Sequence, residues 1–270
     1  MKLEAGQTAV ITGAASGIGR ALAHAFGRRG LAVVALDVEP GPLEEVARGL
    51  AASGVTVLAQ HCDVTDPDGF LAIRDRVLDR FGRVDVLCNN AGVVGPVRPA
   101  WEQRPQDWQW ILDVNLHGVV NGLAAFLPGI VAAGRGHIVN VSSIAGLAPI
   151  PGGGNAPYAA SKYAVVGLSE TLAAELAGRG LDIGVTIVCP GRVATRIREA
   201  ERNRPAALQD PGYDGRPAQF GESAPAADPE DVAAQVLDAI EAGRLFLLPG
   251  FDVADGVRAR AARLAACLPG

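Results

Sequence analysis

The chain has 270 residues, of which 49% are hydrophobic and 20% charged, so it can bury a large core and is not expected to be disordered throughout. Its formal net charge is -5, and charges of both signs are mixed without a long basic block, which gives no indication of a nucleic-acid groove or an anionic membrane surface. The length suits one sizeable α/β domain or two small domains.

The first half of the chain alternates apolar strands with helices. We expect strands at 8–12, 31–37, 55–64 and 84–92, and helices at 17–29, 42–53 and 66–82, with Asp66 as the cap of the third helix. The strands are apolar almost throughout rather than alternating, which is typical of a parallel sheet covered by helices on both faces.

The second half keeps this rhythm with longer helices. Helices are expected at 105–133, 157–178 and 229–242, and strands at 136–143, 182–191 and 244–250. Right-handed crossovers between parallel strands favour an α/β doubly wound sheet of about seven strands, in a single domain that spans 1–270. Ligands of such a sheet bind outside the carboxyl ends of its strands.

Residues 114–134 contain no Asp, Glu, Lys or Arg and are long enough to span a bilayer. Asn115, His117, Asn121, Pro128 and four glycines in this stretch argue against a membrane span. We expect instead a helix that its own sheet, or its sheet together with another subunit, buries on several sides.

Residues 199–227 are rich in Pro, Gly, Arg and acidic residues and show little apolar periodicity. This segment is either a solvated insertion or a lid over a pocket. Because loops of this length inside compact domains are commonly functional, we favour a substrate lid over about 192–227.

The stretch TAVITGAASGIG, residues 8–19, ends the first strand in three glycines, Gly13, Gly17 and Gly19. Such glycines let the backbone turn sharply and let a pyrophosphate approach main-chain amides at the start of the following helix. The spacing GxxxGxG differs from the GxGxxG fingerprint, so an ordinary tight turn is the alternative.

The second strand ends at Asp37, about twenty residues beyond the glycine loop, where an acidic side chain can accept hydrogen bonds from an adenosine ribose. A carboxylate there also repels a 2′-phosphate. No Arg or Lys directly follows Asp37, and Ser16 rather than a basic residue precedes Gly17, so NAD is favoured over NADP. The alternative is that Asp37 only caps the strand end.

The stretch YAASK places Tyr158 and Lys162 one turn apart on one face of a predicted helix. Of the 24 lysines and arginines only two are lysines, Lys2 and Lys162. A free phenol has a pKa of about 10, and an ammonium beside it, together with an oxidised nicotinamide, favours phenolate, so Tyr158 is predicted to be a general acid/base. Ser143, which ends a strand, is either a hydroxyl for the same substrate oxygen or a structural serine.

These residues belong to an ordered series of motifs: TGxxxGxG at 12–19, Asp63 in CDV, NNAG at 89–92, Asn115 in DVN, Ser143, YxxxK at 158–162, and PG at 190–191 with Thr195. In this combination the chain resembles the compact branch of the short-chain dehydrogenases/reductases. The resemblance runs from about residue 7 to 250.

The resemblance implies a single-domain Rossmann fold, a homotetramer, and hydride transfer between a nicotinamide and a carbonyl or alcohol carbon. It implies that Tyr158 exchanges the proton, that Lys162 lowers the pKa of Tyr158 and holds the nicotinamide ribose, and that Ser143 orients the substrate oxygen. Asn115 would bind a water that links Lys162 to solvent; the alternative is a polar residue satisfied inside a helix.

For the cofactor, the resemblance implies that Asp63 and Val64 contact adenine, that Asn89 to Gly92 line the dinucleotide, and that Pro190 to Thr195 reach the nicotinamide side. With the glycine loop, the predicted cofactor-binding residues are Gly13, Ser16, Gly17, Ile18, Gly19, Asp37, Asp63, Val64, Asn89, Ala91, Gly92, Tyr158, Lys162, Pro190, Gly191, Val193 and Thr195.

The interval from Ser143 to Tyr158 is slightly longer than is common in the family, which predicts a reshaped loop at the pocket mouth and leaves Ser142 as an alternative to Ser143. Two further sets of residues, the tryptophans and the arginines after the PG motif, each allow two interpretations. The tryptophans 101, 108 and 110 are expected to pack rather than to form a pocket wall, and the arginines 192, 196 and 198 to form a solvated face rather than to bind a substrate carboxylate.

The four cysteines show no CxxC pair and follow no secretory segment, so we expect reduced thiols in a cytoplasmic protein. The four histidines show no HExxH spacing, and no metal site is expected.

We therefore predict an NAD-dependent oxidoreductase that interconverts a secondary alcohol and a ketone on a small-molecule substrate in an apolar pocket, with no nucleic-acid or membrane partner. The alternatives are an NADPH-dependent carbonyl reductase and a non-catalytic dinucleotide-binding protein. A sugar-nucleotide enzyme of the extended branch is disfavoured, since that branch carries a longer C-terminal region.

Overall fold

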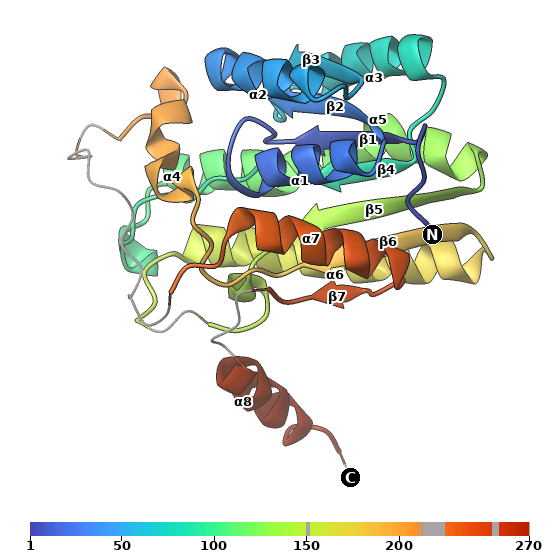
Figure 1. Cartoon of the computed structure of the whole chain (residues 1–270). Coiled ribbons are helices and arrows are strands. Elements are labelled where there is room, and N and C mark those ends of the chain that lie inside the picture. The colour runs from blue at the N-terminus through green and yellow to red at the C-terminus, as the bar shows by residue number, and fades with distance from the viewer. Residues whose placement is uncertain (150–151, 211, 213–224, 250–253, 270) are drawn as a thin grey trace.

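The computed structural model describes residues 1–149, 152–210, 212, 225–249 and 254–269. In this part of the chain seven parallel strands form one sheet, in the order β3-β2-β1-β4-β5-β6-β7 (Figure 1). The strands are β1 Thr8–Thr12, β2 Ala32–Asp37, β3 Val57–His61, β4 Val86–Asn89, β5 Arg135–Val141, β6 Asp182–Val188 and β7 Phe246–Leu247. The predicted doubly wound, Rossmann-type sheet is confirmed.

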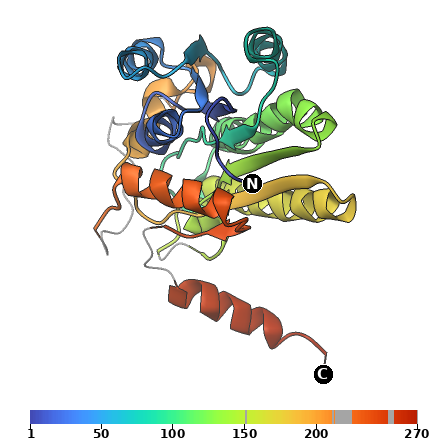
Figure 2. The same ribbon diagram turned by 45° about the vertical axis from the view of Figure 1, so that its right-hand side comes forward.

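Helices cover both faces of the sheet, as Figure 2 shows. On one face α1 Gly17–Arg28, α2 Pro40–Ala52 and α7 Pro229–Glu241 share an apolar cluster with the sheet. On the other face α3 Pro67–Phe81, α5 Gly118–Ala132 and α6 Ala156–Gly178 form a second cluster. The central strands β1 and β4 are buried at every residue because both of their faces are covered, whereas the edge strand β3 is partly exposed. Asp66 caps α3 as expected, accepting a hydrogen bond from the backbone N–H of Gly69.

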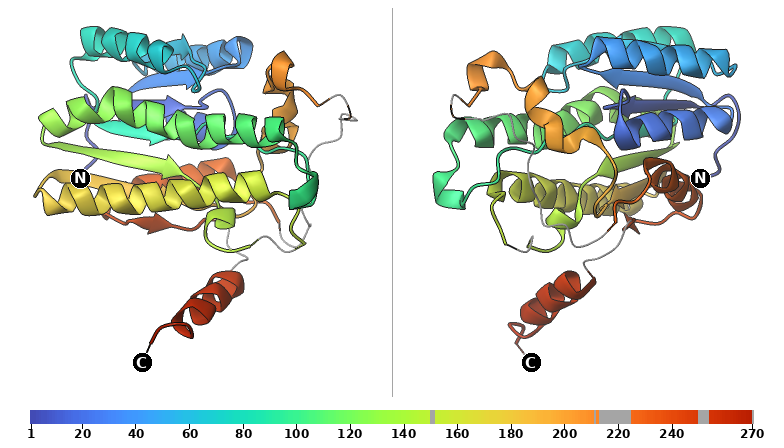
Figure 3. Two further views of the ribbon diagram at one scale, coloured as in Figure 1. Left: turned by 180° about the vertical axis from the view of Figure 1, so that it is seen from behind. Right: turned by 60° about the vertical axis from the view of Figure 1, so that its left-hand side comes forward.

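The helix expected at 105–133 is not one regular α-helix. α4 Pro105–Leu112 leads through a π-helical turn, Asp113–His117, into α5. Within the described residues this stretch, Pro105–Ala132, is the one helix long and apolar enough to cross a membrane. It runs along the sheet beside α6 (Figure 3). Core helices of soluble proteins can also have this length and apolar composition.

The strand order reverses at β1, which pairs with β2 on one side and with β4 on the other. The carboxyl ends of these strands therefore diverge around a crevice, the usual place for a ligand in this architecture.

The segment after β6 crosses this end of the sheet in two 3₁₀ helices, η4 Arg196–Asn203 and η5 Ala206–Leu208. The predicted lid continues through 211 and 213–224, which lie outside the described residues. The tail forms a further helix, α8 Ala254–Ala265, in which no residue is buried. It lies at the edge of the molecule (Figure 1), where the Arg260 guanidinium stands 5.2 Å from the centre of the Tyr163 ring.

Candidate active site

A cavity of about 650 Å³ opens at the carboxyl ends of the strands and extends under the segment after β6. The predicted site residues that line it come from seven separate parts of the chain. They are Gly13, Ser16, Gly17, Ile18, Asp37, Asp63, Val64, Ala91, Gly92, Ser143, Tyr158, Lys162, Pro190, Gly191, Val193 and Thr195. Gly19, Asn89 and Asn115 are not among the lining residues.

The glycine loop presents the start of α1 to this cavity. Ser16 is extended, and within the described chain its side chain makes no capping hydrogen bond, so it leaves the first N–H groups of α1 open. Gly17 has a φ of +52°, and a Cβ there would lie 2.8 Å from Cγ2 of Thr195. The loop therefore combines an open helix N-terminus with close approach of the segment after β6, an arrangement that suits a pyrophosphate.

Gly19 and Asn89 do not line the cavity but support the backbone around it. A Cβ on Gly19 would lie 2.1 Å from the carbonyl oxygen of Gly13, so the glycine permits the loop to fold on itself. The Asn89 amide donates to Oδ1 of Asn140 at 2.9 Å, inside the sheet. The next residue, Asn90, lines the cavity and donates from Nδ2 to the Thr12 carbonyl oxygen at 2.8 Å.

Asn115 lies in the π-helical turn, fully buried. Its Oδ1 accepts from the Val93 N–H at 2.8 Å, and its Nδ2 donates to the Val93 carbonyl at 2.9 Å and to Ser161 Oγ at 3.0 Å. These bonds tie the loop after β4 to α6. They match the interpretation of Asn115 as a polar residue satisfied inside a helix, and its water-binding role stays a prediction.

Tyr158 and Lys162 lie one turn apart near the start of α6, both buried. The Lys162 Nζ stands 5.7 Å from the centre of the Tyr158 ring and donates to the Val141 carbonyl oxygen at 3.0 Å. Burial lowers the pKa of Lys162 to about 8. A Cβ on Gly92 would lie 3.3 Å from Nζ, so a glycine at this position leaves the ammonium exposed to the cavity.

The two serines at the end of β5 have different partners. Ser142 Oγ donates to the Lys162 carbonyl oxygen at 2.8 Å, which directs it into α6. Ser143 hydrogen-bonds the Tyr158 phenol, and this bond favours the phenolate and lowers the pKa of Tyr158. This geometry favours Ser143 over Ser142 as the serine beside the reacting atoms.

Burial raises the pKa of the Tyr158 phenol, and this cause outweighs the opposing hydrogen bond from Ser143. The expectation that Lys162, together with an oxidised nicotinamide, brings this pKa below its ordinary value stays a prediction. The physical reason for the rise is that a buried phenol loses much of the hydration that stabilises its anion.

The wall beside Tyr158 is apolar. Tyr158 packs in one cluster with Val94, Trp110, Ala145 and Ala200. Trp110 is buried and lines the cavity, so the expectation that the tryptophans only pack is incomplete for this residue. Trp101 is 83% exposed, and the packing prediction is wrong there.

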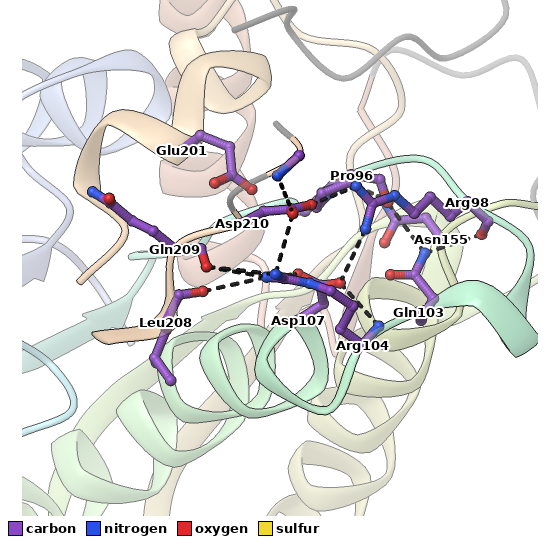
Figure 4. Close-up of polar contacts among 12 residues, drawn as sticks. Pro96, Arg98, Gln103, Arg104, Asp107, Asn155, Glu201, Leu208, Gln209 and Asp210 are labelled. Atoms are coloured by element: carbon purple, nitrogen blue, oxygen red, sulfur yellow. Dashed lines mark hydrogen bonds and ion pairs between the residues drawn. The ribbon is translucent and has the colours of Figure 1, made fainter. Parts of the chain in front are cut away.

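A buried ionic network, missed by the sequence analysis, ties the segment after β6 to α4 (Figure 4). Asp107 forms ion pairs with Arg204 at 2.5 Å and with Arg104 at 3.4 Å. Asp210 pairs with Arg98 and, at 3.1 Å, with Arg104. The Asp107 and Arg204 side chains are both fully buried, so the network anchors the segment beside the apolar wall.

Asp37 lines the opposite end of the cavity. Its two carboxylate oxygens accept from the backbone N–H groups of Ala15 and Glu39, each at 2.9 Å. The residue thus caps the strand end and also faces the cavity, and each oxygen has a further acceptor site for a ribose hydroxyl. Burial raises the pKa of Asp37, with these backbone bonds opposing that rise.

The arginines after β6 line the cavity, and Arg192 and Arg196 are exposed there, in line with the solvated face that we expected. Arg196 lies 3.8 Å from the Glu39 carboxylate and 3.2 Å from that of Glu199. Within the described residues no group of three or more His, Cys, Asp and Glu side chains is arranged to hold a metal ion.

Known proteins of one family are similar to this chain in sequence and in fold. The family model for short chain dehydrogenases matches residues 7–206. The 1-deoxy-11-beta-hydroxypentalenate dehydrogenase of Streptomyces arenae is 38% identical over 250 residues, which cover 91% of this chain and 83% of that protein. The chain belongs to the short-chain dehydrogenase/reductase family of oxidoreductases.

Solved structures of relatives contain either nicotinamide dinucleotide. A short-chain dehydrogenase/reductase from Burkholderia phymatum in complex with NAD has a TM-score of 0.90 and 33% identity, covering 98% of this chain and 96% of that chain. A metagenomic short-chain oxidoreductase in complex with NADP has a TM-score of 0.72 and 34% identity, with 93% and 98% covered. A nicotinamide dinucleotide is therefore supported as the cofactor, and these two structures do not distinguish between NAD and NADP.

Proposed function

We propose that this protein is an NAD-dependent dehydrogenase that interconverts a secondary alcohol and a ketone. The observation that carries the proposal is a single cavity with Ser143, Tyr158 and Lys162 at one end and Asp37 at the other. The open start of α1 between these ends is suited to the pyrophosphate of a dinucleotide. The apolar wall around Trp110 favours a small to medium substrate with a largely apolar body.

Bound NAD would supply the acceptor for the hydride that leaves the alcohol carbon. Tyr158 Oη then takes the hydroxyl proton as the carbonyl forms, and returns it when the reaction runs in reverse. Ser143 stabilises the phenolate and orients the substrate oxygen, while the positive charge of Lys162 favours the deprotonated phenol. Because burial favours the neutral phenol, these two residues are needed to make proton transfer reversible near neutral pH.

Asp37 supports NAD over NADP, because a carboxylate that accepts ribose hydroxyls repels a 2′-phosphate. The name of the Streptomyces relative describes a dehydrogenase of a hydroxylated compound, which is in line with alcohol oxidation here. We also propose a cytoplasmic homotetramer, as in the family resemblance. The exposed Val120 and Val131 on α5 give such an assembly an apolar face to cover, and light scattering of the purified protein tests it.

A panel of secondary alcohols, hydroxysteroids, sugars and diols, followed by the absorbance of the reduced cofactor with NAD and NADP in parallel, tests the function. We expect turnover of at least one apolar alcohol with a preference for NAD. Full occupancy by NAD without any turnover would indicate a non-catalytic dinucleotide-binding protein. A clear preference for NADP would show that Asp37 has been misinterpreted and would favour a carbonyl reductase.

A further inference from the structure

Two residues beyond Asp37, Glu39 meets an arginine that lies 163 positions later in the chain. Arg202 donates from Nε to Oε1 of Glu39 at 3.0 Å and from Nη2 to Oε2 at 2.6 Å, a two-bond pair of guanidinium and carboxylate. Both side chains are partly solvated, with exposed fractions of 25% for Arg202 and 17% for Glu39. Both residues line the cavity at its Asp37 end.

The position of this pair places it where NAD and NADP differ, at the adenosine 2′-position. In dinucleotide-binding sheets the acidic residue that ends the second strand meets the adenosine 2′-hydroxyl, and a nearby arginine accommodates a 2′-phosphate where one is present. Here Asp37 occupies the acidic position, and the Arg202 guanidinium lies within range of its charge, since Asp37 contributes to raising the pKa of Arg202 after the larger effect of Glu39. A cation able to bind a phosphate is thus present, but a carboxylate holds it.

We propose that Glu39 is a specificity-determining residue: by holding Arg202 beside Asp37, it withholds that guanidinium from a 2′-phosphate and so maintains discrimination against NADP. This inference rests on the proposed function, and it assigns the discrimination to two carboxylates with different tasks. Asp37 accepts the ribose hydroxyl, and Glu39 occupies the Arg202 guanidinium, which would otherwise bind the phosphate.

The contacts of Arg202 make this assignment specific. Its Nη1 donates to the carbonyl oxygens of Arg196 at 3.1 Å and of Glu199 at 3.0 Å, so the guanidinium is also anchored within η4. Removal of the Glu39 charge therefore frees Nε and Nη2 without releasing the group from the cavity. Arg196, 3.8 Å from the same carboxylate, stays bound through its Nε to Glu199 at 3.2 Å. Guanidinium groups bind phosphate through two parallel hydrogen bonds, the geometry that Glu39 satisfies in the native chain.

The test measures the dissociation constants of NAD and NADP by isothermal titration calorimetry for the full chain and for Glu39→Gln, Arg202→Gln and the double variant. We expect Glu39→Gln to shift the ratio of the two constants toward NADP by about tenfold, the change that one additional charge-assisted hydrogen bond produces. Arg202→Gln alone gives no such shift, and the double variant loses the gain.

Glu44→Gln is the matched control, because Glu44 lies exposed on α2, the helix that Glu39 precedes, and its replacement removes the same charge. It is expected to leave the ratio unchanged. An equal shift in Glu44→Gln would overturn the inference, because it would assign the effect to net charge. An unchanged ratio in Glu39→Gln would also overturn it, and so would a gain in NADP binding that persists in the double variant. Wild-type protein that binds neither nucleotide would overturn the proposed function as well, whereas NAD binding with an unchanged ratio in Glu39→Gln overturns the inference alone.

Discussion

The two ends of the cavity are assembled in different ways. At the Tyr158 end, the reacting side chains lie on neighbouring elements, β5 and α6, and hydrogen bonds such as that from Lys162 to Val141 fix them against backbone. At the Asp37 end, the carboxylate of Glu39 meets Arg202 from a segment more than 160 residues away. The first end depends on burial and local geometry, and the second depends on ion pairs between distant parts of the chain.

This difference separates chemistry from selection. Groups that exchange a proton must keep a fixed position and a tuned pKa, which buried backbone contacts provide. Groups that distinguish two nucleotides need only a charge of the correct sign within range of the 2′-position. A long charged side chain such as that of Arg202 can supply it. Replacements at the first end should therefore change rate, and replacements at the second should change selectivity.

The largest expected effect comes from Tyr158→Phe. Loss of the hydroxyl removes the proton carrier, so kcat should fall by about 10²–10⁴-fold, the usual contribution of general acid/base catalysis. The dissociation constant for NAD should stay near that of the parent, as measured by calorimetry. Tyr163→Phe, on the same helix but in contact with Arg260, is the control and should retain the parent rate. A Tyr158→Phe protein with parent turnover would refute the assigned mechanism.

Stability should separate the two ionic clusters. Asp107→Asn removes one of the two carboxylates that pair with the fully buried Arg204 guanidinium and leaves only Glu201, so we expect a loss of about 3 kcal/mol in the free energy of unfolding. Glu39→Gln should change the same quantity by about 1 kcal/mol or less, because its ion pair is partly solvated. Urea unfolding at pH 7 measures both; equal losses would contradict the distinction between a buried anchor and a partly solvated pair.

A buried histidine inside the sheet, His137, should make the free energy of unfolding fall at acid pH. Burial lowers the pKa of His137 from 6.5 to about 3, so folding favours the neutral ring, which bonds Thr186 Oγ1 at 2.8 Å. The stability that this provides is complete above pH 6.5 and is lost as the pH falls toward 3, with a slope of at most about 1.4 kcal/mol per pH unit. The unfolding free energy at pH 7 and pH 5 should differ less in His137→Gln than in the parent. Replacement of the exposed His61 by Gln is the control and should keep the pH dependence of the parent. An unchanged pH dependence in His137→Gln would show that His137 does not cause the loss of stability at acid pH.

The smallest expected effect is on the pH–rate profile of Ser143→Ala. The hydrogen bond from Ser143 lowers the pKa of Tyr158, so its removal should move the alkaline rise of alcohol oxidation to higher pH. Steady-state rates across pH in wild type and in Ser142→Ala provide the comparison, since Ser142 bonds the backbone of Lys162 instead. A larger displacement in Ser142→Ala would mean that the two serines have been assigned in the wrong order.

Sequence patterns predicted the sheet because apolar strands and helical periodicity are local properties, and the same holds for the start of α1 and the spacing of Tyr158 and Lys162. Side-chain direction at strand ends was harder to predict. Asn89 turns into the sheet whereas Asn90 turns toward the cavity, and composition does not identify which of two adjacent residues faces a ligand.

Two further features escaped prediction for physical reasons. The π-helical turn, DVNLH, contains neither glycine nor proline to mark a break, so its extra residue was not visible in the sequence of 105–133. The pairing of Glu39 with Arg202 depends on the path of the segment after β6, where charged and polar residues offer many possible partners. The burial of Asp107 was equally hidden, because its partner Arg204 lies 97 positions away.

The π-helical turn also limits how the length of this helix can change. One extra residue in Asp113–His117 sets the rotation between α4 and α5, and an ideal helix turns by about 100° per residue. Deletion of a single residue there would restore a regular helix while swinging the two halves relative to each other. Trp110 and Phe126 could then not both reach the sites in which they are buried. Substitutions in this stretch should be accommodated far more readily than single-residue insertions or deletions.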